Sequence, residues 1–129
     1  MSRYFVDSWA WIEYLEGSVQ GEKVRRRMSD ETNEIFTHVV SVAEIVSKVK
    51  RKGKDAESAW GAISTNSKVW IVDEMGSKDA ALLHAAMKSD RRSFGLADAF
   101  VLSAALKLGA RVLTGDPDFK GLKDVEMLS

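Results

Sequence analysis

The sequence predicts an α/β protein: a three-layer α/β/α fold with a central parallel sheet of about five strands. Short apolar runs of strand length alternate with helix-length segments along the whole chain. These runs are continuously apolar, which is typical of parallel strands that helices cover on both faces. With 129 residues, one proline and no linker-like segment, the chain is expected to form a single domain over residues 1–129.

In the first half of the chain, helix starts and stops follow each apolar run. Gly17 and Gly53 are expected to end two of the helices. Ser41, followed three residues later by Glu44, has the pattern of a capping box at a helix start. The expected elements are a strand at 4–6, a helix at 8–17, a polar helix at 21–29, a strand at 34–40, a helix at 41–53 and a helix at 55–65.

The second half continues the alternation of strands and helices. Its most apolar helix ends at Gly109, and the stretch "RRSFG" before that helix is expected to be a loop. The expected elements are a strand at 68–73, a helix at 77–90, a loop at 91–95, a helix at 96–108, a strand at 111–114 and a candidate fifth strand at 125–128.

Composition excludes several function classes. Nineteen basic and nineteen acidic side chains give a net charge of zero, so binding to nucleic acid must depend on local patches. The absence of cysteine excludes disulfides, a thiolate zinc site and a cysteine nucleophile. No apolar run has transmembrane length and the N-terminus does not resemble a signal peptide, so a cytoplasmic protein with no membrane partner is expected.

Four acids fall where a ligand site is expected. Asp7 and Asp116 follow strands, and Glu44 and Asp98 are expected in the first turns of helices. In an open parallel sheet, ligands bind beyond the carboxyl ends of the strands, so all four acids should lie at one edge.

Three of these acids also have structural interpretations. Asp7 is a favourable N-cap for the first helix. Glu44 completes the expected capping box and precedes Lys48 by four residues, a favourable order on a helix. Asp116 followed by Pro117 is good turn chemistry.

Asp98 is harder to explain as a structural residue. It lies on the apolar stripe of its helix with Val101 and Leu102, where an uncompensated charge costs several kcal/mol. Several carboxylates at one edge would also repel one another, and a bound divalent cation would remove that conflict. Because the expected ligands are all oxygen atoms, Mg²⁺ is the expected cofactor, with Mn²⁺ as the alternative. Such an ion can activate water against a phosphodiester.

The chain resembles the PIN-domain ribonucleases, in particular the toxins of VapBC-type toxin–antitoxin pairs. The resemblance rests on "YFVDSW", "SVAEIVSK", "LADAFVLSAA" and "VLTGDPDF", which occur in family order and spacing. It implies a sheet in the order 3-2-1-4-5 and a Mg²⁺-dependent endoribonuclease with an antitoxin partner. It also implies that the acids holding the metal are Asp7, Glu44, Asp98 and Asp116.

Other residues match the family pattern less directly. Ser8 and Thr114 match the small hydroxyl residues beside the first and last acids, and Phe119 matches a packing aromatic. Asp118 has two interpretations: it assists the metal site through water, or it only caps the short turn.

Local basic residues are the candidates for RNA binding. Arg91 and Arg92 lie a few residues before Asp98, and the run "KVKRKGK" at 48–54 ends the helix that carries Glu44. Single-stranded RNA is the expected substrate, because its bases can be splayed out and stacked. The wide apolar arc of the first helix indicates a buried core helix, a homodimer face or an antitoxin groove.

Three rival interpretations stay open. A receiver-like signalling domain would use Asp73 as its phosphate acceptor. An inactive binding module would keep the fold without turnover. A housekeeping RNA-processing nuclease would have the same chemistry without an antitoxin.

Overall fold

The computed structural model describes residues 1–128 and contains the predicted sheet. Five parallel strands are arranged in the order β3-β2-β1-β4-β5, which confirms both the fold class and the expected strand order. The strands are β1 (Arg3–Val6), β2 (Glu34–His38), β3 (Lys68–Trp70), β4 (Arg111–Thr114) and β5 (Val125–Met127).

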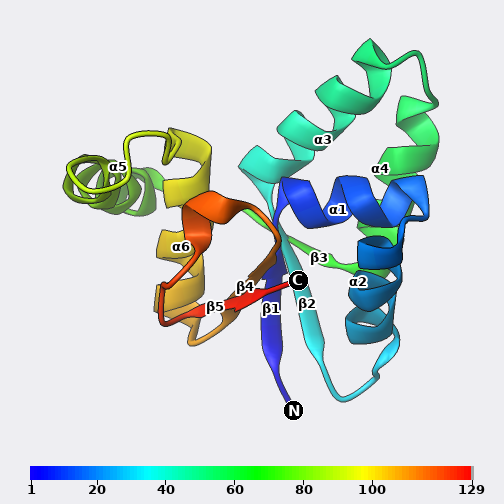
Figure 1. The fold of residues 1–129 in the computed structure, drawn as a ribbon, viewed down its shortest axis with the longest axis horizontal. Coiled ribbons are helices and arrows are strands. Elements are labelled where there is room, and N and C mark those ends of the chain that lie inside the picture. Colours follow the sequence, from blue (N-terminus) through cyan, green and yellow to red (C-terminus); the bar gives the residue numbers. More distant parts are fainter. Residues whose placement is uncertain (129) are drawn as a thin grey trace.

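Helices cover both faces of the sheet (Figure 1). The first four helices pack on one face, and the last two pack on the other. The helices are α1 (Ser8–Glu16), α2 (Val19–Ser29), α3 (Val39–Arg51), α4 (Ala56–Asn66), α5 (Glu74–Lys88) and α6 (Leu96–Leu108). A short 3-10 helix, η1 (Pro117–Phe119), follows β4.

Each face of the sheet has its own apolar core. On the α1 side, Trp11 is fully buried, and its indole Nε1 donates a hydrogen bond to Thr37 Oγ1 at 2.9 Å. On the α6 side, the rings of Phe94 and Phe119 pack edge to face with their centroids 5.4 Å apart. Phe119 is therefore a packing aromatic, as the resemblance implied.

The junction between β2 and α3 differs from the prediction. Helix α3 begins at Val39 and not at Ser41, because His38 is the N-cap and its Nδ1 accepts a hydrogen bond from the Val40 N–H. Among residues 1–128 the buried Ser41 hydroxyl has no hydrogen-bond partner, so the predicted capping box was wrong. Glu44 consequently lies in the second turn of the helix and not in the first.

The region around β3 also differs from the prediction. β3 ends at Trp70, and α5 begins three residues earlier than expected, because Asp73 caps it by accepting a hydrogen bond from the Gly76 N–H at 2.8 Å. The receiver-like interpretation was wrong. A receiver has the strand order 2-1-3-4-5, and Asp73 here is an exposed helix cap.

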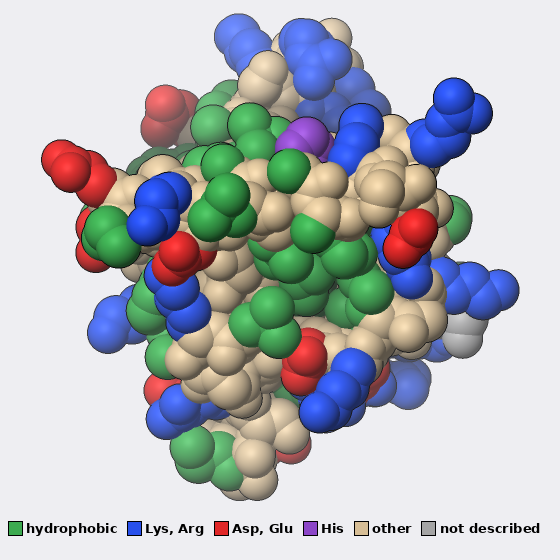
Figure 2. All heavy atoms as spheres, turned by 90° about the vertical axis from the view of Figure 1, so that its left-hand side faces the viewer, with side chains coloured by type: hydrophobic (Ala, Val, Ile, Leu, Met, Phe, Trp, Pro, Cys, Tyr) green, Lys and Arg blue, Asp and Glu red, His purple; other side chains and the backbone are tan. Residues whose placement is uncertain are grey.

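Large apolar side chains are exposed at positions that were not predicted from the sequence. Trp11 and Ile12 of α1 are buried, so the apolar arc of that helix mainly builds the core. Large exposed apolar side chains lie instead on α5 and α6, including Met75, Leu82 and Leu106, and Figure 2 shows apolar side chains across this face. Within residues 1–128, no helix has the length and apolar character needed to cross a membrane.

Candidate active site

Asp7 lies at the carboxyl end of β1 and caps α1. Its Oδ1 accepts the Ala10 N–H at 2.9 Å, and its Oδ2 accepts the hydroxyl of Thr114 at 2.5 Å. The backbone at Asp7 is extended, as an N-cap requires. Because aspartate is a favoured N-cap residue, this position could be predicted from the sequence. The Thr114 bond was not predictable in the same way, since it joins two strand ends 107 residues apart.

The carboxyl of Asp7 is more buried than a surface cap. Only 4% of the residue is exposed, and burial raises its pKa to about 7. The hydrogen bonds from Thr114 and Ala10 oppose this rise in pKa, whereas the negative charges of Asp98 and Asp116 add to it. Because the fold holds this acid where its charge is unfavourable, a nearby positive charge would stabilise its ionised form.

Asp98 lies in the first turn of α6, as predicted. Its Oδ2 accepts a hydrogen bond from the Gly95 N–H at 2.9 Å, so it also stabilises the start of the helix. Burial raises the pKa of Asp98 to about 6, while the Gly95 bond lowers it. The charges of Asp116, Glu44 and Asp118 raise it further, which places these acids in the same electrostatic environment.

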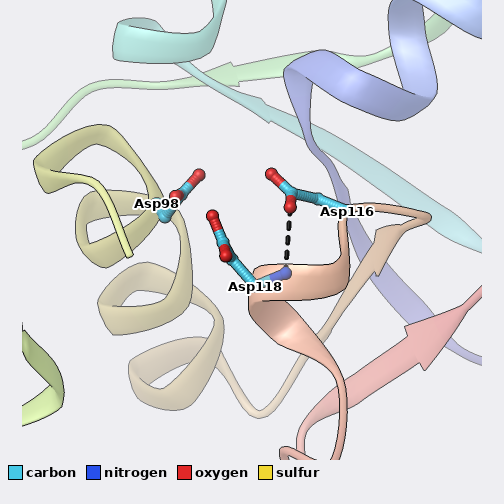
Figure 3. A group of neighbouring side chains, drawn as sticks. All are labelled: Asp98, Asp116 and Asp118. Carbon is cyan, nitrogen blue, oxygen red and sulfur yellow. Dashed lines mark hydrogen bonds between the residues drawn. The ribbon is translucent and has the colours of Figure 1, made fainter. Parts of the chain in front are cut away.

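Asp116 and Asp118 face Asp98 from the segment after β4 (Figure 3). Asp116 Oδ1 accepts the Asp118 N–H at 2.9 Å, which fixes the turn into η1, and Pro117 begins this short helix. One carboxylate oxygen from each of Asp98, Asp116 and Asp118 lies within 4.8 Å of the others. Figure 3 shows the three carboxylates directed toward a common space.

Thr114 connects the strand ends that carry two of these acids. Its Oγ1 donates to Asp7 and accepts the Asp116 N–H at 3.0 Å. Because the Thr114 side chain is completely buried, this bridge holds both acids in fixed positions.

Glu44 approaches the same edge from α3. The side chain is exposed overall, but neighbouring atoms desolvate the carboxyl, which raises its pKa. A hydrogen bond from Ser8 and the charge of Lys48 lower the pKa and partly offset this rise. Glu44 acts electrostatically on Asp98, so the structure brings all four predicted acids to one edge of the sheet. Asp118 is a fifth acid at this edge. Its role was left open in the sequence analysis, because its position depends on the η1 turn.

The two arginines predicted to bind RNA have different environments. Arg91 is half-buried, and its Nη1 donates a hydrogen bond to the backbone carbonyl of Asp118 at 2.9 Å. Arg92 is exposed. Arg91 therefore supports the loop that carries Asp118. Arg92 lies at the surface, where a residue that binds RNA is expected.

The donor set fits a hard divalent cation. Asp98, Asp116 and Asp118 offer converging carboxylate oxygens, which are the ligands that Mg²⁺ and Mn²⁺ prefer. Burial, and to a smaller extent the neighbouring carboxylates, raise the pKa of Asp7 and of Asp98, so a bound cation would stabilise their ionised forms. The acidic cluster can therefore hold a metal ion.

Comparison with known proteins gives one family and a consistent set of folds. Residues 4–125 match the PIN domain family. None of the curated proteins matches the chain significantly.

Solved structures with the same fold come from several bacteria. VapBC2 from Rickettsia felis, solved bound to a DNA fragment from its promoter, gives a TM-score of 0.76 at 14% identity, covering 98% of this chain and 99% of that one. The sarcin–ricin loop cleaving toxin VapC20 of Mycobacterium tuberculosis gives 0.74 at 21% identity, with coverages of 95% and 98%. A toxin–antitoxin complex from Klebsiella pneumoniae gives 0.72 at 17% identity, with coverages of 100% and 98%. At these identities the likeness establishes the fold.

Proposed function

Because the chain belongs to the PIN domain family, we propose that it is a Mg²⁺- or Mn²⁺-dependent endoribonuclease that hydrolyses phosphodiester bonds in single-stranded RNA. The observation that carries the proposal is the convergence of Asp98, Asp116 and Asp118 at the carboxyl edge of a parallel sheet, with Asp7 beside them. An acid cluster that is only structural would not require a carboxylate as deeply buried as Asp7.

Each acid has its own task in this proposal. Asp98, Asp116 and Asp118 would hold the cation, with Asp7 and Glu44 adding negative charge at its border. When bound, the cation would supply the positive charge that stabilises charge developing on a scissile phosphate. Asp7 is fixed by Ala10 and Thr114 so that its carboxylate cannot turn away from the site.

Positioning of the acids comes from the surrounding backbone and hydroxyl groups. Thr114 sets the distance between the ends of β1 and β4, and Ser93 donates a hydrogen bond to Asp118 Oδ1. Arg91 holds the carbonyl of Asp118, so this loop is supported from two sides. Arg92 would contact RNA at the surface of the site, as the sequence predicted.

The biological role we propose is that of the toxin in a VapBC-type pair, with an antitoxin protein as its partner. Support comes from the fold shared with structures of toxin–antitoxin complexes. A housekeeping RNA-processing nuclease without an antitoxin remains the alternative. A homodimer and a cytoplasmic location also stay predictions. The exposed apolar face of α5 and α6, which includes Leu82, is the surface best suited to form the dimer.

A cleavage assay tests the proposed activity. Labelled single-stranded RNA is incubated with the protein in Mg²⁺, in Mn²⁺ and in chelator, and cleavage is expected only with metal. Asp7→Asn should abolish cleavage, because it removes the charge but keeps an oxygen that can cap α1. Cleavage in chelator, or an Asp7→Asn protein as active as the wild type, would show that the activity comes from another site or from a contaminant.

A further inference from the structure

A cavity of about 400 Å³ opens beside the acids, between α1 and α3. Glu44 and Asp116 form part of its wall, so it is continuous with the candidate site. Lys48 and Arg51 line it from α3, and Trp9 lines it from α1. The cavity thus combines an aromatic ring, two cations and access to the catalytic edge.

The indole of Trp9 has a fixed position over the end of β4. A Cβ atom at Gly115 would lie 2.2 Å from Cη2 and 2.3 Å from Cζ3 of that ring, so the ring packs directly on the backbone there. Gly115 immediately precedes Asp116, an acid of the site. Trp9 is only partly buried, and it forms part of the wall of the cavity.

The two cations of the cavity are available for a ligand. Lys48 and Arg51 are exposed, and neither forms an ion pair with an acid within residues 1–128. Lys48 is close enough to lower the pKa of Glu44. Next to a cluster of acids that would repel RNA, two unpaired cations at one wall provide a local path for a phosphate backbone.

We propose that this cavity is the subsite for the nucleotide next to the scissile phosphate: an unpaired base stacks on Trp9, and the adjoining phosphate binds Lys48 and Arg51. This inference rests on the proposed ribonuclease function and adds to it the side from which RNA enters. Stacking on an aromatic ring tolerates any base, so the subsite favours single-stranded RNA without setting its sequence.

Fluorescence anisotropy tests the subsite without requiring cleavage. The probe is a 5′-fluorescein-labelled single-stranded RNA of about 12 nucleotides, titrated in chelator at low salt. Trp9→Ala should weaken binding by about 5-fold to 150-fold, the range for one lost base stack, and Trp9→Phe should recover most of it. Trp60→Ala is the matched control, because Trp60 is a surface tryptophan on α4.

Salt dependence tests the two cations. Replacing Lys48 and Arg51 together with alanine should reduce the magnitude of the slope of log K against log salt by about 0.7, which corresponds to one phosphate contact on a single strand. Lys78→Ala on α5 is the control, and it should leave the slope unchanged.

The outcomes separate this inference from the proposed function. If the wild type cleaves RNA but Trp9→Ala binds it as well as the wild type does, the subsite is refuted and the nuclease stands. Loss of affinity in Trp9→Ala without any cleavage by the wild type would support binding of RNA in this cavity, but would reject the nuclease and with it the position next to a scissile phosphate. The subsite is also refuted if Trp60→Ala weakens binding as much as Trp9→Ala, or if the wild type does not bind the probe.

Discussion

Replacing Asp7 with asparagine should make the metal-free protein more stable, and by an amount that grows with pH. Asparagine retains an oxygen to accept the Ala10 N–H, so the cap on α1 is kept while the buried charge is removed. Its amide nitrogen takes the place of Oδ2, which accepts the Thr114 hydroxyl, and the cost of losing that acceptor does not depend on the charge of Asp7. The part of the difference in stability that changes with pH should therefore reflect the charge on Asp7.

The size of the effect follows from the pKa of Asp7. Burial raises it from 3.8 to about 7, and one pKa unit corresponds to about 1.36 kcal/mol, so ionising Asp7 costs the folded state about 4 kcal/mol in full. Between these two values the folded state binds more protons than the unfolded state, so the stability of the wild type falls as pH rises. Because the unfolded state is already partly ionised at about pH 4.5, the advantage of Asp7→Asn should grow by about 3 kcal/mol between there and about pH 8.

Urea unfolding of both proteins at the two pH values, in chelator, measures this difference. Asp73→Asn is the matched control, because Asp73 also accepts a hydrogen bond as a helix cap but is exposed and escapes the desolvation. Adding Mn²⁺ at about pH 8 should stabilise the wild type more than Asp7→Asn. An advantage for asparagine that does not change with pH would refute the view that Asp7 is a destabilising charge.

Three further substitutions test the surroundings of the acids. Gly115→Ala should lower the free energy of unfolding in urea by about 1–3 kcal/mol, because the added Cβ overlaps the indole of Trp9. Unchanged stability would mean that the indole can move away from this position. Arg92→Ala should weaken RNA binding and flatten its salt dependence with little effect on melting temperature. Arg91→Ala should also lower the melting temperature, because the backbone carbonyl of Asp118 loses its hydrogen-bond donor. Equal melting temperatures for Arg91→Ala and Arg92→Ala would contradict this.

Much of the fold could be predicted because its signals are local. Continuous apolar runs separated by helices indicated the parallel sheet, and Gly17 and Gly109 end helices in the left-handed conformation that glycine favours. Asp7 was recognisable as a cap, and Asp98 was conspicuous as a charge on an apolar stripe.

The errors occur where a local signal competed with a tertiary one. The Ser41 pattern predicted a helix start, but His38 supplies the cap and the strand passes directly into α3. The apolar arc of α1 had three interpretations, and the burial of Trp11 favours the core helix among them. Histidine is an uncommon cap, so no local pattern favoured His38 over Ser41 as the start of the helix.

The parts of the site that were not predicted depend on contacts between distant segments. Asp118 reaches Asp98 only because η1 folds back after β4, and Trp9 meets Gly115 across more than a hundred residues of sequence. Such adjacencies follow from the strand order and the packing, which no short pattern encodes.

The proposed function depends on Asp98 and its neighbouring acids holding one divalent cation. Calorimetric titration of Mn²⁺ into the wild type, Asp98→Asn and Asp73→Asn tests it most directly. Both substitutions keep an oxygen that can accept the hydrogen bond at a helix start, so they differ mainly in where a charge is lost. We expect an affinity at least tenfold weaker, by about 1.4 kcal/mol or more, for Asp98→Asn and wild-type affinity for Asp73→Asn. Equal affinity for all three proteins would contradict it.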